Sequence, residues 1–147
     1  MSVYTRLFNE DDFEKLDELS ELFKDLGYSP NRNELIERLT EIHNHKDYYL
    51  LLLIKNNKII GLSGMCKMLF YERNGKYMRV LAFVINSNYR GLGLGNKLLR
   101  ESENFSKQLN CKVITLNSGD RKERLAAHNL YNNSGYYNTT VGFTKNL

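Results

Sequence analysis

With 147 residues, the chain fits one domain of ordinary size and is too short for two separate cores. Hydrophobic residues make up 41% and charged residues 26%, a balance that excludes disordered and collagen-like chains and indicates a soluble globular protein. The formal net charge of +4 favours an anionic partner, but no Lys/Arg block of the nucleic-acid-binding kind occurs. A poly-anionic small molecule fits this charge equally well.

Neither a membrane nor a metal is expected as a partner. The longest apolar stretch, Tyr48 to Ile54, is far below the roughly 20 residues that span a bilayer, and the N-terminus lacks the apolar region of a signal peptide. We therefore expect a cytoplasmic location. Cys66 and Cys111 belong to no C-x-x-C pair or zinc-type cluster, so we expect small buried apolar side chains. His43 and His45, two residues apart, fall on different faces of a helix and are not expected to bind a metal.

The first third of the chain predicts a strand and two helices. Val3 to Leu7 alternates like a short strand. Asp11 or Asp12 can cap the helix that follows, and Gly27 ends it. The apolar positions of this helix recur at helical spacing: Phe13, Leu16, Leu19, Leu22, Phe23 and Leu26. A second helix is predicted from about Asn33 to His43.

Three consecutive strands are predicted in mid-chain. Tyr48 to Lys55 and Lys58 to Phe70 flank Asn56-Asn57, a typical tight turn, and should pair antiparallel. Asn74-Gly75 marks another turn before a third strand, Tyr77 to Ile85. These strands form a meander.

The segment after the meander predicts one parallel crossover. Glycine-rich residues Arg90 to Gly95 open a helix from about Asn96 to Leu109, and the buried-looking strand Val113 to Leu116 follows. A last helix, residues 122–132, ends at Gly135, and Tyr136 to Lys145 supplies one bent strand or two short ones. The order indicates an α/β (α+β mixed) fold, with a mixed, mostly antiparallel sheet of six to seven strands and about four helices.

The glycine-rich segment predicts an anion site, because backbone N–H groups and the positive end of the helix dipole face outward there. The Rossmann pattern fails because Asn96 and Leu98 replace its last glycine. The Walker pattern fails because Asn96 follows Gly95. The pattern that fits is Arg-x-x-Gly-x-Gly, formed by Arg90, Gly93 and Gly95. A merely tight turn is the alternative reading of these glycines.

At this point the chain resembles the GNAT superfamily, whose coenzyme A pyrophosphate loop reads Gln/Arg-x-x-Gly-x-Gly/Ala after the fourth strand. The resemblance spans nearly the whole chain. Ile85 to Gly91 resembles the lead-in to that loop, although Ser87 stands where a proline is frequent. Residues 124–131, followed by Gly135-Tyr136, resemble the second family signature, and Gly142 to Leu147 is similar to the last strand of many members.

The resemblance implies acetyl-CoA as co-substrate. In the family the fourth strand splays from the fifth at a bulge, so that its backbone meets the pantetheine arm and the thioester oxygen. We accordingly expect the cofactor to contact the main chain of Phe83, Val84 and Ile85, the loop residues Arg90, Gly91, Leu92, Gly93, Leu94, Gly95 and Asn96, and also Asn117 and Arg124.

Arg124, Ala127, His128 and Tyr131 share one face of the last predicted helix. By resemblance Tyr131 protonates the departing coenzyme A thiolate, which suits a phenol of pKa about 10; a structural tyrosine is the alternative. Many members have Asn in place of Arg124, but a branch with Arg-x-x-Ala-His-x-x-Tyr includes aminoalkylphosphonate N-acetyltransferases. Arg124 and His128 then contact the cofactor or the acceptor, or else pair on the surface.

The general base is not identified by the sequence. Many GNAT enzymes carry an acidic residue on the fourth strand, whereas Tyr77 to Ile85 contains none. His128, Glu72 and a water relay are the candidates. Tyr28, in the loop between the first two helices, falls in the region that lines the acceptor pocket in the superfamily, and Glu72 is a second candidate acceptor contact.

The function expected from these observations is transfer of an acetyl group from acetyl-CoA to a primary amine of a small molecule or peptide, by direct attack in a ternary complex. The alternative is a non-catalytic acyl-CoA-binding sensor or partner subunit with the same fold. The sequence does not choose among a polyamine, an aminoalkylphosphonate, an aminoglycoside and a peptide amine as acceptor. The expected assembly is a monomer or homodimer.

Overall fold

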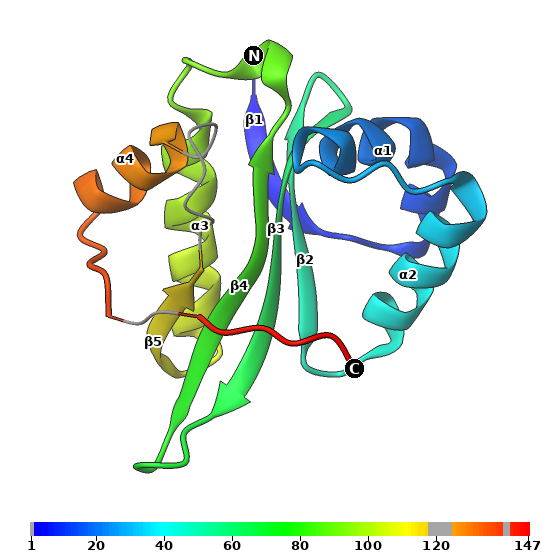
Figure 1. Cartoon of the computed structure of the whole chain (residues 1–147). Coiled ribbons are helices and arrows are strands. Elements are labelled where there is room, and N and C mark those ends of the chain that lie inside the picture. Colours follow the sequence, from blue (N-terminus) through cyan, green and yellow to red (C-terminus); the bar gives the residue numbers. More distant parts are fainter. Residues whose placement is uncertain (1, 118–124, 140–141) are drawn as a thin grey trace. The chain divides into compact units, whose positions relative to one another are not determined.

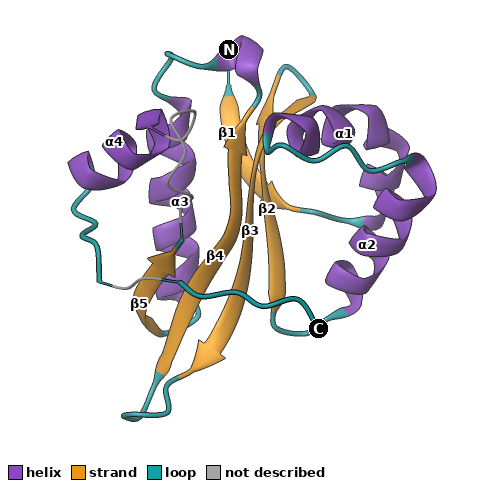
Figure 2. Cartoon of the chain, in the orientation of Figure 1, coloured by secondary structure: helices purple, strands orange, loops and turns teal. Residues whose placement is uncertain are grey.

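The computed structural model describes residues 2–117, 125–139 and 142–147. The chain divides into two compact units, Met1–Asn117 and Ser118–Leu147. The first unit contains a five-stranded sheet with helices on both of its faces (Figures 1 and 2). The glycine-rich loop belongs to this unit.

The strands are β1 (Val3–Leu7), β2 (Tyr48–Lys55), β3 (Lys58–Leu69), β4 (Lys76–Ile85) and β5 (Cys111–Leu116). They lie in the sheet in chain order, β1-β2-β3-β4-β5. The first three pairings are antiparallel and the β4–β5 pairing is parallel. The predicted meander and the single crossover are both confirmed.

Two layers of helix cover the sheet of the first unit. A 3-10 helix, η1 (Glu10–Lys15), leads into α1 (Leu16–Asp25), and α2 (Arg32–Asn44) follows. The crossover helix is α3 (Leu94–Gln108). Figure 1 shows α1 and α2 on one side of the sheet and α3 on the other, which agrees with the two apolar clusters that form the core.

Each cluster joins one face of the sheet to its helices. The first contains residues of α1, α2 and alternate positions of β2 to β4, among them Leu19, Leu22, Leu35, Leu39, Leu52, Leu62 and Val84. The second joins the opposite face to α3 through Leu53, Ile60, Met65, Met78, Val80, Ile85, Leu94 and Leu98. Burial on both faces explains why β2 and β3 are almost continuously apolar.

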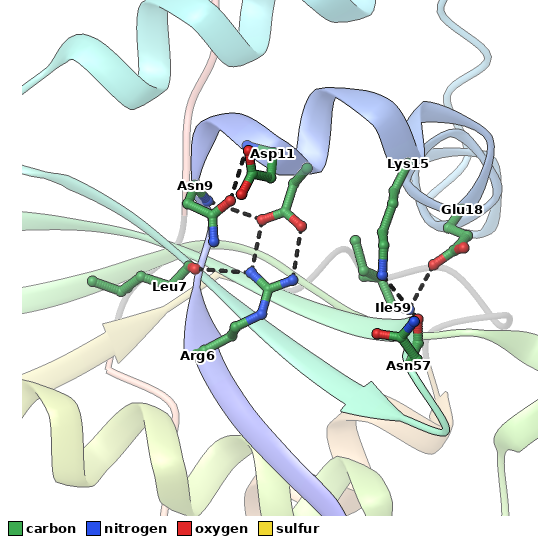
Figure 3. Close-up of polar contacts among 9 residues, drawn as sticks. Arg6, Leu7, Asn9, Asp11, Lys15, Glu18, Asn57 and Ile59 are labelled. Carbon is green, nitrogen blue, oxygen red and sulfur yellow. Dashed lines mark hydrogen bonds and ion pairs between the residues drawn. The ribbon is translucent and has the colours of Figure 1, made fainter.

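The start of the first helix differs from the prediction. Asn9 is the cap: its side chain accepts a hydrogen bond from Asp11 N at 2.9 Å. Asp12 instead accepts from Asn9 N and forms a two-bond ion pair with Arg6, 2.7 Å for each bond (Figure 3). Capping by Asp11 or Asp12 is therefore wrong, because Asn9 begins the turn two residues earlier and the Asp12 carboxylate is needed by Arg6.

The turn between β2 and β3 is as predicted. Asn56 and Asn57 have φ of 51° and 62°, the left-handed conformation that a two-residue hairpin turn requires and that Asn tolerates. Lys15 Nζ donates to Asn57 O at 2.8 Å, and Ile59 N donates to Glu18 Oε1 at 2.7 Å (Figure 3). The hairpin is thereby fastened to the start of α1.

The second unit contains α4 (Leu125–Asn133), which ends before Gly135 at φ 87°. The predicted start of this helix, residues 122–124, lies outside the described residues. The predicted last strand is not seen in the described residues: residues 136–139 and 142–145 have no regular structure, and Figure 2 draws them as loop. In the part of the chain that the structure describes, the sheet therefore has five strands and not six to seven. Residues such as Tyr137 and Phe143, 82% and 95% exposed, have strand propensity, but propensity alone does not supply a partner strand.

No helix within the described ranges is long and apolar enough to span a membrane.

Candidate active site

β4 pairs with β5 along only the first half of its length. Their parallel ladder runs from Lys76–Cys111 to Val80–Leu116 and, in the described part of the chain, ends there. On the other side of β4, Gly64 pairs with Ala82 and Met65 with Val80, so Leu81 is an extra residue with no opposite number on β3. Such a bulge bends its strand and increases the local twist. From Leu81 onward, β4 thus has no strand paired to its β5 side among the described residues.

The bulge also shifts the alternation of side chains along β4. Met78 and Val80 pack in the α3 cluster before the bulge, and Phe83 and Ile85 do so after it. Ala82 and Val84 pack in the cluster of α1 and α2. The predicted cofactor contacts Phe83, Val84 and Ile85 therefore lie together in the segment of β4 that extends past the β5 ladder.

The glycine-rich loop follows β4 and a 3-10 turn, η2 (Ser87–Tyr89). Gly91 and Gly93 have φ of 79° and 75°, a left-handed conformation that residues with a Cβ rarely adopt. A Cβ at either position would meet no other atom within 4 Å. Glycine is therefore required here by backbone conformation, and the loop faces open space.

The first turn of α3 is suited to an anion. Gly93 is the N-cap residue, so no side chain caps the helix, and its first turn contains no acidic residue. The N–H groups of a first turn have no partner inside the helix, and the helix dipole makes this end positive. Arg90 Nε donates to Ile85 O at 3.2 Å, which holds this exposed cation at the edge of the loop. Leu92 is 59% exposed beside it.

Two carboxylates of α1 accept hydrogen bonds from the residues that precede the glycine-rich loop. Glu18, Glu21 and Asp25 follow one another at a spacing of three and four residues, so they share a helix face; we call them the carboxylate row. Glu21 Oε2 accepts from Asn86 Nδ2, and Asp25 Oδ2 accepts from Ser87 N, both at 2.9 Å. Sequence reasoning missed these contacts, although the helical spacing of the three acids was a usable signal.

Other polar residues meet on the opposite side of β4 from α3. Arg79 pairs with Thr115 in the β4–β5 ladder. With the Asn117 amide in the orientation that satisfies its neighbours, its oxygen accepts from Arg79 Nη2 and its nitrogen donates to Leu116 O at 3.3 Å. Asn117, a predicted cofactor contact, thus lies beside a cation that the sequence interpretation did not single out.

The predicted acceptor contacts lie apart from each other along the chain and in the fold. Tyr28 is 63% exposed in the loop between α1 and α2. Glu72 is exposed in the β3–β4 turn, before Lys76, the first residue of β4. From Lys76 to Phe83 is seven residues, about 23 Å of strand. Glu72 is therefore at the far end of β4 from the glycine-rich loop.

Two predicted catalytic residues lie on α4 of the second unit. His128 and Tyr131 are three residues apart and so share a helix face. Tyr131 is 6% exposed, and its ring centroid lies 6.1 Å from that of Tyr136. Tyr136 N donates to Tyr131 O at 3.0 Å, which fixes the end of the helix. Arg124 lies outside the described residues.

The cysteines and the remaining histidines have structural surroundings. Burial raises the pKa of the Cys66 and Cys111 thiols, so both are protonated at neutral pH and poor nucleophiles. The His43 ring packs on Phe8 at 5.4 Å between centroids, and the His45 ring contacts Tyr48. Where the structure describes the chain, no group of three or more His, Cys, Asp or Glu is placed to hold a metal ion.

The chain is similar to known proteins of one family. The model of the Acetyltransferase (GNAT) family matches residues 11–136. A crystal structure of a GNAT family acetyltransferase from Staphylococcus aureus is 60% identical, covers 100% of both chains and superposes with a TM-score of 0.90. The chain belongs to the acetyltransferase (GNAT) family and is an acyltransferase.

Two further proteins are similar to this chain, one in sequence and one in fold. Glucosamine 6-phosphate N-acetyltransferase 1 of Dictyostelium discoideum is 31% identical over 119 residues, 75% of this chain and 72% of the relative. An aminoglycoside acetyltransferase from an uncultured soil metagenomic sample, in complex with sisomicin, has a TM-score of 0.81 at 18% identity and covers 99% of this chain and 96% of its own. The second likeness shows the fold alone.

Proposed function

We propose that this protein transfers the acetyl group of acetyl-CoA to a primary amine of a small molecule or peptide, by direct attack in a ternary complex. The observation that carries the proposal is the succession of three features on one stretch of chain. The β5 ladder ends at Val80, β4 has an unpaired residue at Leu81, and the strand then leads into the open glycine loop. Membership of the family supports the same reading.

The residues present fit coenzyme A. Pyrophosphate needs backbone donors without a crowding side chain, and Gly91 and Gly93 leave the loop backbone open. Arg90 adds a fixed positive charge, and the first turn of α3 adds none of the opposite sign. When bound, acetyl-CoA supplies an activated thioester carbonyl. The backbone of Phe83 to Ile85 orients the pantetheine arm, and Leu92, Leu94, Gly95, Asn96, Asn117 and Arg124 complete the proposed contacts.

Proton transfer is assigned to the second unit. Tyr131 donates its phenolic proton to the departing thiolate, and His128, three residues earlier on the same helix face, takes the proton of the attacking amine directly or through water. This assignment follows from the family signature and from the chemistry of the two side chains. Neither cysteine takes part, since both thiols stay protonated at neutral pH, and no covalent intermediate on the protein is formed.

The amine class is supported by the names of relatives. The Dictyostelium relative is named for glucosamine 6-phosphate, a small molecule with one primary amine and one phosphate. At 31% identity this name supports a small-molecule amine here more than a peptide. Tyr28, exposed in the loop between α1 and α2, is the proposed side chain that contacts such an acceptor.

One observation favours the second candidate function, a non-catalytic acyl-CoA-binding protein. β4 carries no acidic residue, so the proposed base comes from elsewhere. A protein that binds acyl-CoA without turnover needs the glycine loop and no base. The experiment that separates the two is thiol release from acetyl-CoA by the purified protein, over a panel of polyamines, amino sugars, aminoalkylphosphonates and peptides, with the acetylated amine identified by mass spectrometry.

Release of one thiol per acetylated amine supports the transferase. Calorimetric binding of acetyl-CoA with no release over the whole panel supports the non-catalytic binder. Absence of acetyl-CoA binding contradicts both functions.

A further inference from the structure

Within residues 2–117, 125–139 and 142–147, Arg79 is a cation in the interior of the sheet that forms no ion pair with a carboxylate. It lies on β4 between β3 and β5, where Cys66 is opposite on one side and Thr115 on the other, and its side chain is partly buried. The ion pairs found within the described residues involve Arg6, Lys58 and Lys67. Among the described residues, the guanidinium donates one hydrogen bond, to the Asn117 side-chain oxygen.

The described residues do not use the full hydrogen-bonding capacity of this guanidinium. It carries five N–H donors in a fixed fork and no acceptor, and a neutral amide oxygen uses one of them. Partly buried charges are normally paired, because leaving one unpaired costs free energy. The fork matches the two oxygens of a carboxylate or phosphate.

A second unsatisfied group lies next to Arg79. The Thr115 hydroxyl oxygen is buried and has no hydrogen-bond partner among the described residues. Thr115 pairs with Arg79 in the parallel ladder, so the two side chains point to the same face of the sheet on strands about 4.8 Å apart. An oxyanion bound between them would accept from the guanidinium and, with a small local movement to expose it, from the buried hydroxyl.

Arg79 and Thr115 lie on the face of the sheet opposite α3, so they are placed to contact the acceptor and not the cofactor phosphates. Met78 and Val80 face α3, so Arg79 between them faces away from α3 and from the loop at its N-terminus. Arg79 precedes Ala82 by three residues, about 10 Å of strand. The pair therefore lies beside the last residues of the β4–β5 ladder and on the other face of the sheet from the proposed pyrophosphate site.

We propose that Arg79, with Thr115, binds an oxyanion carried by the acceptor, so that the substrate class is a primary amine with a phosphate, phosphonate or carboxylate roughly 10 Å or less from its nitrogen. This inference rests on the proposed function, because it names the acceptor of the same reaction. Arg79 is then the residue that selects anionic amines over neutral ones.

The test uses matched pairs of amines that differ in the anion. Glucosamine 6-phosphate is compared with glucosamine, phosphoethanolamine with ethanolamine, and γ-aminobutyrate with butylamine, each at saturating acetyl-CoA. The wild-type protein, Arg79→Gln, Thr115→Val and the control Arg73→Gln are assayed, since Arg73 is an exposed arginine in the β3–β4 turn. Acetyl-CoA dissociation constants and melting temperatures are measured for all four proteins.

Wild type should prefer the anionic member of at least one pair in kcat/KM by roughly 10- to 100-fold. Arg79→Gln should lose that preference by raising the KM of the anionic amine, with kcat/KM of the neutral amine at saturating acetyl-CoA unchanged. Thr115→Val should lose part of it, and Arg73→Gln none. Which pair shows the preference identifies the oxyanion.

The outcomes separate this inference from the proposed function. If wild type acetylates amines without preferring any anionic member, or if Arg79→Gln keeps the preference, the inference is overturned while the transferase stands. If no amine is acetylated, the transferase fails, and calorimetry of the same pairs with the coenzyme A complex decides the inference. Tighter binding of an anionic amine that Arg79→Gln abolishes supports it, and equal binding overturns it.

Discussion

Asn86 ties the end of β4 to α1 by donating from its side-chain nitrogen to Glu21 Oε2 at 2.9 Å. The same amide accepts from Asn88 N at 2.9 Å, and Asn86 N donates to Ile60 O at 2.8 Å. Asn86 is 1% exposed, so these bonds cannot be replaced by water without rearrangement. Asn86, between β4 and the loop, is therefore fixed by hydrogen bonds to α1, to η2 and to β3.

Replacement of this residue tests whether the anchor serves the cofactor. Asn86→Ala should lower the free energy of unfolding by about 1–3 kcal/mol, because Asn88 N loses its buried acceptor, and should also weaken acetyl-CoA binding by releasing the loop. Urea unfolding and calorimetry measure the two effects. Asn88→Ala is the control, since Asn88 takes part through its backbone. A destabilised Asn86→Ala protein with unchanged acetyl-CoA affinity would show that the anchor is structural alone.

Gly93→Asp should abolish most acetyl-CoA binding. The new carboxylate would face the pyrophosphate at a position where the backbone has φ 75° and no atom within 4 Å of a Cβ, and like charges repel. We expect a loss of about tenfold or more in affinity by calorimetry. Gly27→Asp is the matched control, because Gly27 also has positive φ and open surroundings but ends α1. Equal affinity in the two variants would rule out this phosphate site.

Arg90→Ala should weaken acetyl-CoA binding less, by about 1–3 kcal/mol, since one charge-assisted contact is removed and the loop amides remain. Arg100→Ala removes the same charge from an exposed position on α3 and should leave the dissociation constant unchanged. A larger effect of Arg90→Ala on turnover than on cofactor affinity would contradict a role at the pyrophosphate.

Tyr131→Phe should lower kcat by roughly 10²- to 10⁴-fold with little change in the acetyl-CoA dissociation constant, because the proposed proton transfer occurs in the transition state. Single-turnover kinetics at saturating substrate report the chemical step before product release. Tyr136→Phe, which alters the neighbouring ring, is the control. Full kcat in a destabilised Tyr131→Phe protein would assign Tyr131 to packing.

The Arg6–Asp12 pair predicts acid-sensitive stability. Burial by itself raises the pKa of Asp12, but the hydrogen bonds from Arg6 and from Asn9 N outweigh it and hold the pKa below its usual range. A lowered folded-state pKa adds stability that is present above the unfolded value of about 3.9 and is lost as pH falls through the folded value. Asp12→Asn should cost about 1.5–3 kcal/mol at neutral pH. The gap between the two unfolding free energies should close below about pH 4; a constant gap would contradict the pair's contribution.

The strands and the loop were predictable because their signals are local. β1 and β2 match the predicted ranges residue for residue, since turn-forming Asn56-Asn57 and the apolar runs set them without reference to distant residues. The predicted last strand failed for the opposite reason: a strand exists through its partner, and the propensity of residues 136–145 does not provide one.

The bulge at Leu81 left no mark in the sequence. Val80 to Ile85 is apolar throughout, so either alternation fits, and the face of each side chain depends on pairing with β3. Arg79 was visible as a lone charge in an apolar strand, but its neighbours Thr115 and Asn117 depend on the register of β5, which the crossover sets over a separation of about 36 residues. The register between two strands so far apart in sequence cannot be predicted from the sequence alone.

The extra residue at Leu81 divides β4 into two segments with separate alternations. A change of side chain at position 79 leaves the facing of Phe83 and Ile85 toward α3 untouched. Under the proposed roles, substitutions in Lys76 to Val80 would then change the acceptor while the coenzyme segment keeps its facing, so the unpaired residue separates the two requirements on a single strand.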